Sequence, residues 1–188
     1  MESWKQEKTE LLLDNPWVQV RRDAVCLPNG AHIEDFYAVT IRDASAIVAL
    51  TPDGGVLLKR EYRYCYGRQL LEIPAGAFEP GETDPLAVAR RELKEETGYT
   101  SDRWEYLGPT IESSGKMTNF MHLFLDRDCR KVSEQSLDAT EELSVEEMPL
   151  EEAVERVMTN EICCNSSAHA LLRVARMLER EAREKYER

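Results

Sequence analysis

The sequence lacks the features that would assign it to a membrane class or a disulfide-stabilised class. Among its 188 residues no uninterrupted apolar run reaches the ~18 residues that a membrane span needs, and the start of the chain, Met1 to Lys5, is charged. Its five cysteines are an odd number and form no Cys-x-x-Cys pair, which indicates neither a disulfide framework nor a zinc site. We therefore expect a cytoplasmic protein with reduced thiols and no membrane partner.

Positive charge is also scarce. The chain has 24 Lys and Arg against 36 Asp and Glu, a formal net charge of -12, which repels polyanions and argues against a nucleic-acid partner. A phosphate-bearing substrate would have to be small and accompanied by cations. The length and the 42% hydrophobic content are nevertheless sufficient for one catalytic domain with a substantial core.

Two common kinds of catalytic motif are missing. The sequence has no Gly-x-Ser-x-Gly nucleophile elbow, and no motif surrounds its three histidines, His32, His122 and His169. The glycine-bearing loop from Gly76 to Gly81 lacks the Lys and the Ser or Thr of a P-loop. We interpret the histidines as structural, and the loop as meaningful only beside the helix that follows it.

Strand signals dominate the first third of the chain. Residues 17–20 alternate, and residues 33–41 are rich in aromatic and β-branched side chains. Residues 45–50 and 56–60 predict a hairpin closed by a Pro-Asp-Gly turn. Further strand signals lie at residues 104–107 and 121–125.

Three helices are predicted after this region. Asp84 as N-cap and Pro85 at the first helical position open a helix that Gly98 closes. Two more are expected over residues 151–158 and 166–186. The pattern predicts an α+β fold in which helices cover a mixed sheet, with residues 1–45 as a strand-rich extension and residues 46–188 as the catalytic domain.

Three carboxylates share one face of the helix after Asp84. At 100° per residue, Glu92, Glu95 and Glu96 fall at about 0°, 300° and 40°, beside the apolar side that contains Ala89 and Leu93. Like charges at this spacing disfavour a helix by ~0.2–0.5 kcal/mol per pair, so a compensating group is expected. A magnesium ion fits, because it prefers carboxylate oxygens. The alternative is an acidic face that is merely solvated.

A sequence signature surrounds these carboxylates. Gly76 is followed after five residues by Glu82, and the segment from Arg91 to Tyr99 reads Arg-Glu-Leu-Lys-Glu-Glu-Thr-Gly-Tyr. This arrangement closely resembles the Nudix box, although Tyr99 replaces an aliphatic residue. Eight residues rather than the usual seven separate Glu82 from Arg91, so we expect one extra residue, Thr83, to be looped out before the helix.

The resemblance extends upstream. Residues 57–64 and 71–76 are similar to the ADP-ribose or ADP-sugar pyrophosphatase branch of the Nudix hydrolase superfamily. It implies a Nudix-type α/β/α sandwich with a mixed sheet and an N-terminal antiparallel extension. It also implies a homodimer and a pyrophosphohydrolase that uses Mg²⁺, or Mn²⁺, to cleave a small nucleoside diphosphate linked to a sugar or similar group. The products would be a nucleoside monophosphate and a phosphorylated compound.

Other functions are compatible with the same fold. A Nudix hydrolase of nucleoside triphosphates or dinucleotides would carry the same glutamates. A non-catalytic module that senses a nucleotide would be expected to lose part of the Arg-Glu-x-x-Glu-Glu set, and an assembly protein would not need it. The intact set favours an enzyme.

By resemblance, residues of the box take defined roles. Glu92 and Glu96 would be the main metal ligands, Glu95 a supporting ligand, and the backbone carbonyl of Ala75 a further oxygen ligand. Arg91 would orient the glutamates. The catalytic set is therefore expected on one helix and on the end of the strand before it.

Substrate contacts are expected from other segments. Arg63 would bind phosphate or the distal sugar, a role that suits its planar guanidinium, or it could be a salt-bridged strand arginine. Trp17, Phe36 and Tyr37 are candidates for stacking on the nucleobase, although aromatic side chains more often pack in cores.

The general base is not assigned by the resemblance. Enzymes of this branch often have a glutamate at the position of Asn119, which cannot act as a base. Glu112 in the same loop is one substitute. Glu142, together with its neighbour Glu141, offers another, and a surface position is the alternative for each.

Overall fold

The computed structural model describes residues 2–187, which divide into two compact units. Unit 1 contains the described residues up to Asp43 and residues 111–120. Unit 2 contains residues 44–110 and the residues from Met121 onward.

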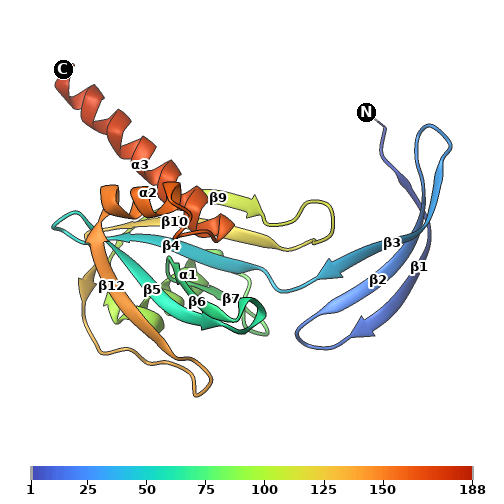
Figure 1. Cartoon of the computed structure of the whole chain (residues 1–188), viewed down its shortest axis with the longest axis horizontal. Helices are drawn as coiled ribbons and strands as arrows, with labels where there is room; N and C mark the ends of the chain where they lie inside the picture. The colour runs from blue at the N-terminus through green and yellow to red at the C-terminus, as the bar shows by residue number, and fades with distance from the viewer. Residues whose placement is uncertain (1, 188) are drawn as a thin grey trace. The chain divides into compact units, whose positions relative to one another are not determined.

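Unit 1 is built on a three-stranded antiparallel sheet with the order β1-β2-β3 (Figure 1). Its strands are β1 (Lys5–Asp14), β2 (Gln19–Cys26) and β3 (His32–Thr40). The strand signals at 17–20 and 33–41 therefore mark β2 and β3. Strand β1 was missed because its polar residues are exposed along its whole length and give no alternation.

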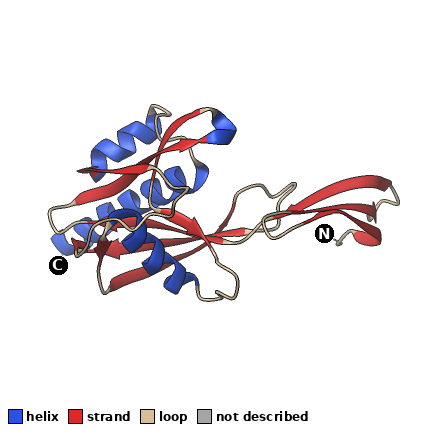
Figure 2. Ribbon diagram, turned by 90° about the horizontal axis from the view of Figure 1, so that it is seen from below, coloured by secondary structure: helices blue, strands red, loops and turns tan. Residues whose placement is uncertain are grey.

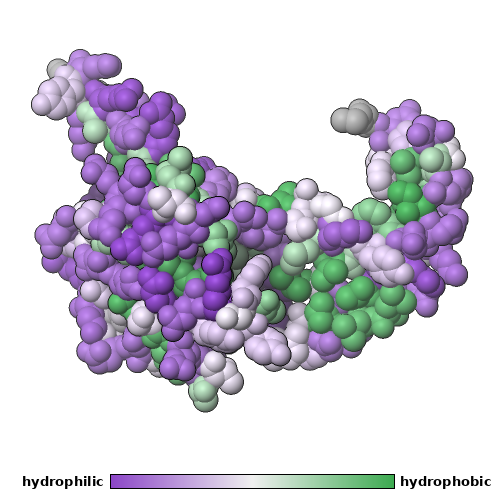
Figure 3. All heavy atoms as spheres, in the orientation of Figure 1, coloured by the Kyte–Doolittle hydropathy of each residue, from purple (hydrophilic) through white to green (hydrophobic). Residues whose placement is uncertain are grey.

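The segment 111–120 pairs with β3 inside this unit. The amide of Val39 donates to the carbonyl of Lys116 at 2.7 Å, and the amide of Thr118 donates to the carbonyl of Val39 at 3.1 Å. The sheet therefore has one covered edge, at β3, while β1 forms the other edge. Figure 3 shows apolar surface along this sheet, and Leu11, Leu12 and Leu13 are among its exposed residues.

Unit 2 contains a mixed sheet with the order β12-β5-β4-β10-β9, in which β6 pairs with β5 and β7 with β4. Strands β4 and β10 run parallel, and the other pairings that are described are antiparallel. The strands are β4 (Ala44–Leu50), β5 (Gly55–Arg63), β6 (Arg68–Glu72), β7 (Ala75–Ala77), β9 (Arg103–Ile111), β10 (Phe120–Arg127) and β12 (Leu143–Pro149). Two short strands, β8 (Tyr99–Thr100) and β11 (Arg130–Lys131), pair with each other, and a 3-10 turn, η1, spans Tyr64–Tyr66.

Helices cover both faces of this sheet (Figure 2). Strand β4 shows why, because Ala46 and Val48 pack with α2 (Leu150–Met158) and α3 (Asn165–Tyr186), whereas Ile47 and Ala49 pack with α1 (Pro85–Thr97). A strand buried on both faces is apolar at consecutive positions, as this one is. The predicted α+β sandwich with a mixed sheet is thus confirmed.

The helix signals were accurate. Asp84 caps α1 by accepting a hydrogen bond from the amide of Leu86 at 3.0 Å, Pro85 is the first helical residue, and Gly98 ends the helix at φ 76°. The predicted helices at 151–158 and 166–186 correspond to α2 and α3. Within residues 2–187 no helix combines the length and the apolarity of a membrane span.

Candidate active site

The carboxylates of α1 lie where this helix contacts β4 and β7 in unit 2. Leu93 is fully buried in the core, and this packing fixes the rotation of the helix. On the same turns Glu92 and Glu96 are buried, while the side chain of Glu95 is 41% exposed. The helix therefore places two of the three predicted metal ligands in a largely desolvated position and leaves one at the rim.

Arg91 holds this cluster together. Its Nη1 donates to Glu92 Oε1 at 2.8 Å and to Glu95 Oε2 at 3.0 Å. Its Nε and Nη2 donate to both carboxylate oxygens of Glu82 at 3.1 and 2.9 Å, and Nη2 also donates to the carbonyl of Ala77 at 3.2 Å. A guanidinium has five N–H donors, and all five are used here. Arg91 is therefore a positioning residue with no donor left for a substrate.

The extra residue before α1 does not break the contact between Glu82 and Arg91. Thr83 is exposed and lies between Glu82 and the N-cap residue Asp84. The hydrogen bonds from Arg91 lower the pKa of Glu82, so this carboxylate stays ionised. The one-residue insertion is thus accommodated in the loop.

Gly76 is explained by a close approach. A Cβ atom at this position would lie 1.9 Å from the carboxyl carbon of Glu92 and 2.0 Å from its Oε1. The backbone of β7 therefore lies directly against the Glu92 carboxylate, which would have to shift if residue 76 carried a side chain. Gly76, the first residue of the box, and Glu92, its first helical glutamate, are therefore in direct contact.

A buried lysine, Lys59 on β5, also belongs to the site. Its Nζ donates to the carbonyl of Ala75 at 3.1 Å and to Glu96 Oε1, and the amide of Ala75 donates to Glu96 Oε2 at 3.0 Å. Burial raises the pKa of Glu96 to about 7, and burial also raises that of Glu92. Burial is the largest influence on Lys59 and lowers its pKa, but the carboxylates of Glu96 and Glu61 together raise this pKa above its ordinary value. Lys59 was not predicted from the sequence, although a lysine among the apolar residues of a buried strand is a recognisable signal.

Arg63 is ion-paired, as one of its two interpretations predicted. Its guanidinium donates to Glu72 Oε2 at 2.7 Å and to Glu61 Oε1 at 2.8 Å. The side chain is 36% exposed, so it lies at the edge of the charged cluster. A role toward phosphate or sugar stays a prediction.

The other predicted residues lie elsewhere. Trp17 and Tyr37 belong to unit 1, where both are exposed rather than part of the core, and the guanidinium of Arg42 lies 4.9 Å from the Trp17 ring centroid. Glu112 is partly buried in the segment 111–120 of unit 1, and Glu142 is exposed in unit 2 before β12. None of these four residues lies on α1, β5 or β7, the elements that carry the carboxylate cluster.

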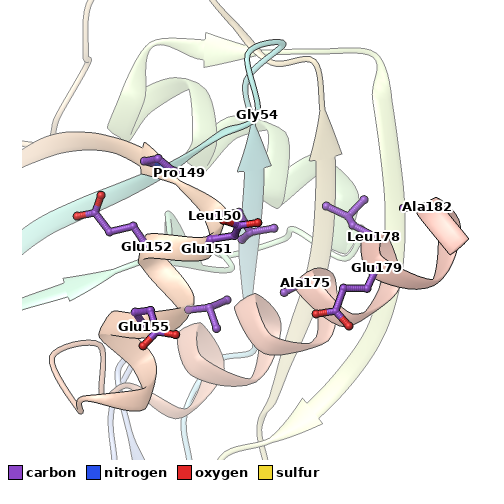
Figure 4. Close-up of a pocket in the computed structure, with 11 residues that line it drawn as sticks. Gly54, Pro149, Leu150, Glu151, Glu152, Glu155, Ala175, Leu178, Glu179 and Ala182 are labelled. Atoms are coloured by element: carbon purple, nitrogen blue, oxygen red, sulfur yellow. The ribbon is translucent and has the colours of Figure 1, made fainter.

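Asn119 is buried, and its Oδ1 accepts no hydrogen bond from residues 2–187. Unit 2 also has a hollow of about 790 Å³ between α2 and α3, close to Gly54 (Figure 4). The residues that line this hollow include none of the predicted site residues. The hollow therefore adds no member to the cluster.

The donor set suits a hard divalent cation. The metal donors at the junction of α1 and β7 are oxygens, from the carboxylates of Glu92, Glu95 and Glu96 and from the carbonyl of Ala75, which lies beside the ammonium group of Lys59. The close approach of Glu92 to Gly76 aims a carboxylate at this point. Oxygen-only donors favour magnesium, calcium or manganese over zinc or copper.

Comparisons with known proteins agree with this geometry. The model of the Nudix domain matches residues 40–162, and that of the nucleoside diphosphate sugar hydrolase N-terminal domain matches residues 4–39. The methanol dehydrogenase activator of Bacillus methanolicus is 33% identical over 159 residues, which cover 84% of this chain and 85% of that protein. The ADP-ribose pyrophosphatase of Bacillus subtilis (strain 168) is 32% identical over 170 residues, which cover 88% of this chain and 91% of that protein.

A solved structure gives the same answer for the fold. The crystal structure of an ADP compounds hydrolase aligns with a TM-score of 0.82 over 97% of this chain and 98% of that chain, at 21% identity. The family assignment rests on the Nudix domain match over more than half of the residues and on the two relatives that are more than 30% identical. They show that the chain belongs to the Nudix family and is a Nudix hydrolase.

The close approach of Gly76 to Glu92 gives a testable prediction. Gly76→Ala should lower the free energy of unfolding by ~1–3 kcal/mol, because the new methyl group displaces a buried carboxylate. In a Glu92→Ala background the clash disappears, and the same change should cost less than half as much. Urea denaturation of the four proteins measures this coupling. An equal cost in both backgrounds would contradict the contact.

Proposed function

We propose that this enzyme is a magnesium-dependent pyrophosphohydrolase of nucleoside diphosphates linked to a sugar or similar group, with ADP-ribose as the model substrate. The observation that carries the proposal is the carboxylate cluster of Glu92, Glu95 and Glu96 on α1. Arg91 binds the first two, and Lys59 binds the third. The ADP-ribose pyrophosphatase and the nucleoside diphosphate sugar hydrolase domain among its similarities support the substrate class. Water would add across one P–O bond of the diphosphate and release a nucleoside monophosphate and a phosphorylated product.

The residues of unit 2 divide this work. Glu92, Glu95, Glu96 and the carbonyl of Ala75 would hold the Mg²⁺ or Mn²⁺ ions. Once bound, such ions neutralise the diphosphate and activate the attacking water. Arg91 keeps the carboxylates in register before any ion arrives, which removes a reorganisation cost from the reaction.

Substrate choice rests on Arg63 and on the aromatic residues of unit 1. Glu61 and Glu72 hold the Arg63 guanidinium at the rim of the cluster. A bound substrate would compete with these two carboxylates for its N–H donors. Trp17 and Tyr37 have exposed rings that a nucleobase could stack on. Asn119, Glu61 and Ser114 differ from the branch that the sequence resembles, and these differences bear on the choice of the distal group or on the rate of the chemistry.

The general base is proposed to be Glu112 or Glu142. Glu141 is the weaker choice, because its Oε2 accepts a hydrogen bond from the amide of Asp138 at 3.0 Å and so closes a turn. Glu112 lies in the segment that contains Asn119, the position where related enzymes have a glutamate.

We also propose a homodimer formed through residues 1–45. Strand β1 is an edge strand, and the apolar residues Trp4, Leu11, Leu12 and Leu13 on and next to it are exposed. An uncovered edge with apolar side chains favours pairing with another chain. A second copy is the partner proposed here, and a cytoplasmic location without nucleic acid stays a prediction from composition.

The substrate class is tested by comparing kcat/KM for ADP-ribose, GDP-mannose, UDP-glucose and ATP with Mg²⁺. We expect at least one diphosphate conjugate to exceed ATP by tenfold or more, since this ratio measures differential transition-state binding. Glu92→Gln should lower the rate by at least ~10²-fold with the fold retained, as for other catalytic electrostatic groups. A tenfold preference for ATP would overturn the substrate class, and near-normal turnover by Glu92→Gln would overturn the role of the cluster.

The base is tested with Glu112→Gln and Glu142→Gln. Removal of the base should lower kcat by ~10²-fold or more and abolish the acidic limb of its pH profile, whereas the other variant should behave as wild type. Wild-type rates in both variants would exclude both residues.

The dimer is tested by sedimentation at micromolar concentration, where the mass should be twice the 21.6 kDa of one chain. Leu12→Asp should shift the protein toward the monomer because a charge at an apolar interface is costly. The matched control is Leu172→Asp, at an exposed leucine of α3, which should leave the mass unchanged. A wild-type monomer would refute the proposal.

A further inference from the structure

Lys59 is the most deeply buried charged side chain of the cluster. It lies two residues after Leu57, on the same side of β5, which faces α1, and its side chain is 2% exposed. A buried ammonium group is strongly unfavourable unless charges and hydrogen bonds compensate it. Its position therefore requires dedicated partners.

Three oxygens surround the Lys59 ammonium group, and each comes from a different strand or helix. They are the Ala75 carbonyl of β7 at 3.1 Å, Glu96 Oε1 of α1, and Glu61 Oε2 of β5 at 3.2 Å. An ammonium group has three N–H donors, so its coordination by the protein is complete. These three oxygens form a small cation site, and the Lys59 ammonium group occupies it.

Two of these three oxygens are also ligands in the proposed function. Ala75 and Glu96 define what we call the inner cation position, whereas Glu92 and Glu95 are held by Arg91 and have no contact of this kind with Lys59. We propose that Lys59 is a resident cation at the inner position and lowers its affinity for a divalent ion when no substrate is bound. This inference rests on the proposed metal dependence and deepens it.

The arrangement has a consequence for substrate binding. An ion would reach the inner position only by sharing Glu96 and the Ala75 carbonyl with the ammonium group, and the added negative charge of a diphosphate offsets the crowding of cations. Ion binding at this position and substrate binding are then thermodynamically coupled, and by linkage each strengthens the other. Glu92 and Glu95 pair with Arg91 rather than with Lys59, so Lys59 imposes no such condition on an ion that binds these two carboxylates.

The test is Mn²⁺ binding to the substrate-free protein, measured from the electron paramagnetic resonance signal of free Mn²⁺. Lys59→Met keeps the length of the side chain and removes its charge. We expect it to bind one more equivalent of Mn²⁺ than wild type, or to bind Mn²⁺ at least tenfold more tightly. Arg60→Met is the matched control, because Arg60 is the next residue of β5 but pairs with Glu146 and Glu161 instead. It should bind Mn²⁺ as wild type does.

Folding is checked by circular dichroism and thermal melting. If Lys59→Met does not fold, Lys59→Gln takes its place, because it is also neutral and retains a donor for Glu96. Mn²⁺ should raise the melting temperature of the neutral variant more than that of wild type. Wild-type stoichiometry and affinity in the folded neutral variant, or weaker binding, would overturn the inference. A wild-type protein that binds no Mn²⁺ and hydrolyses no conjugate would instead overturn the proposed function.

Discussion

Crowded negative charge is the constraint on which the organisation of unit 2 depends. Six glutamates lie in or beside one cluster, and three basic side chains, Arg91, Lys59 and Arg63, pair with all of them. Arg91 pairs with carboxylates of α1 and of the loop before it. Lys59 pairs with carboxylates in the buried interior, and Arg63 pairs with those at the rim. The cluster is therefore ordered before any ligand binds, which is the condition for electrostatic catalysis.

The features that could be predicted from the sequence are those that depend on residues close together in the chain. Asp84, Pro85 and Gly98 fixed the ends of α1, because caps depend on residues within one turn. The α+β fold followed from strand signals in the first third of the chain and from the helix signals after it. The contact of Glu82 with Arg91 could not be predicted in the same way, since it depends on how a loop of irregular length closes.

Lys59 and strand β12 were not predicted from the sequence, and the physical reason is the same for both. Lys59 gains its role from oxygens that are distant in the chain, and its neighbours in β5 alone describe an ordinary buried strand. Strand β12 was missed because its acidic composition is untypical of a strand, and it is stabilised by pairing with β5. Long-range pairing outweighs local propensity in both cases.

Strand β4 has a consequence for how unit 2 unfolds. Its consecutive residues belong to two cores, one shared with α1 and the other with α2 and α3, so neither layer can lose its packing while the strand remains native. Such sharing favours a single cooperative transition. Any ligand that binds only at α1 should then protect the amides of α3 on the opposite face from hydrogen exchange, although it makes no contact there.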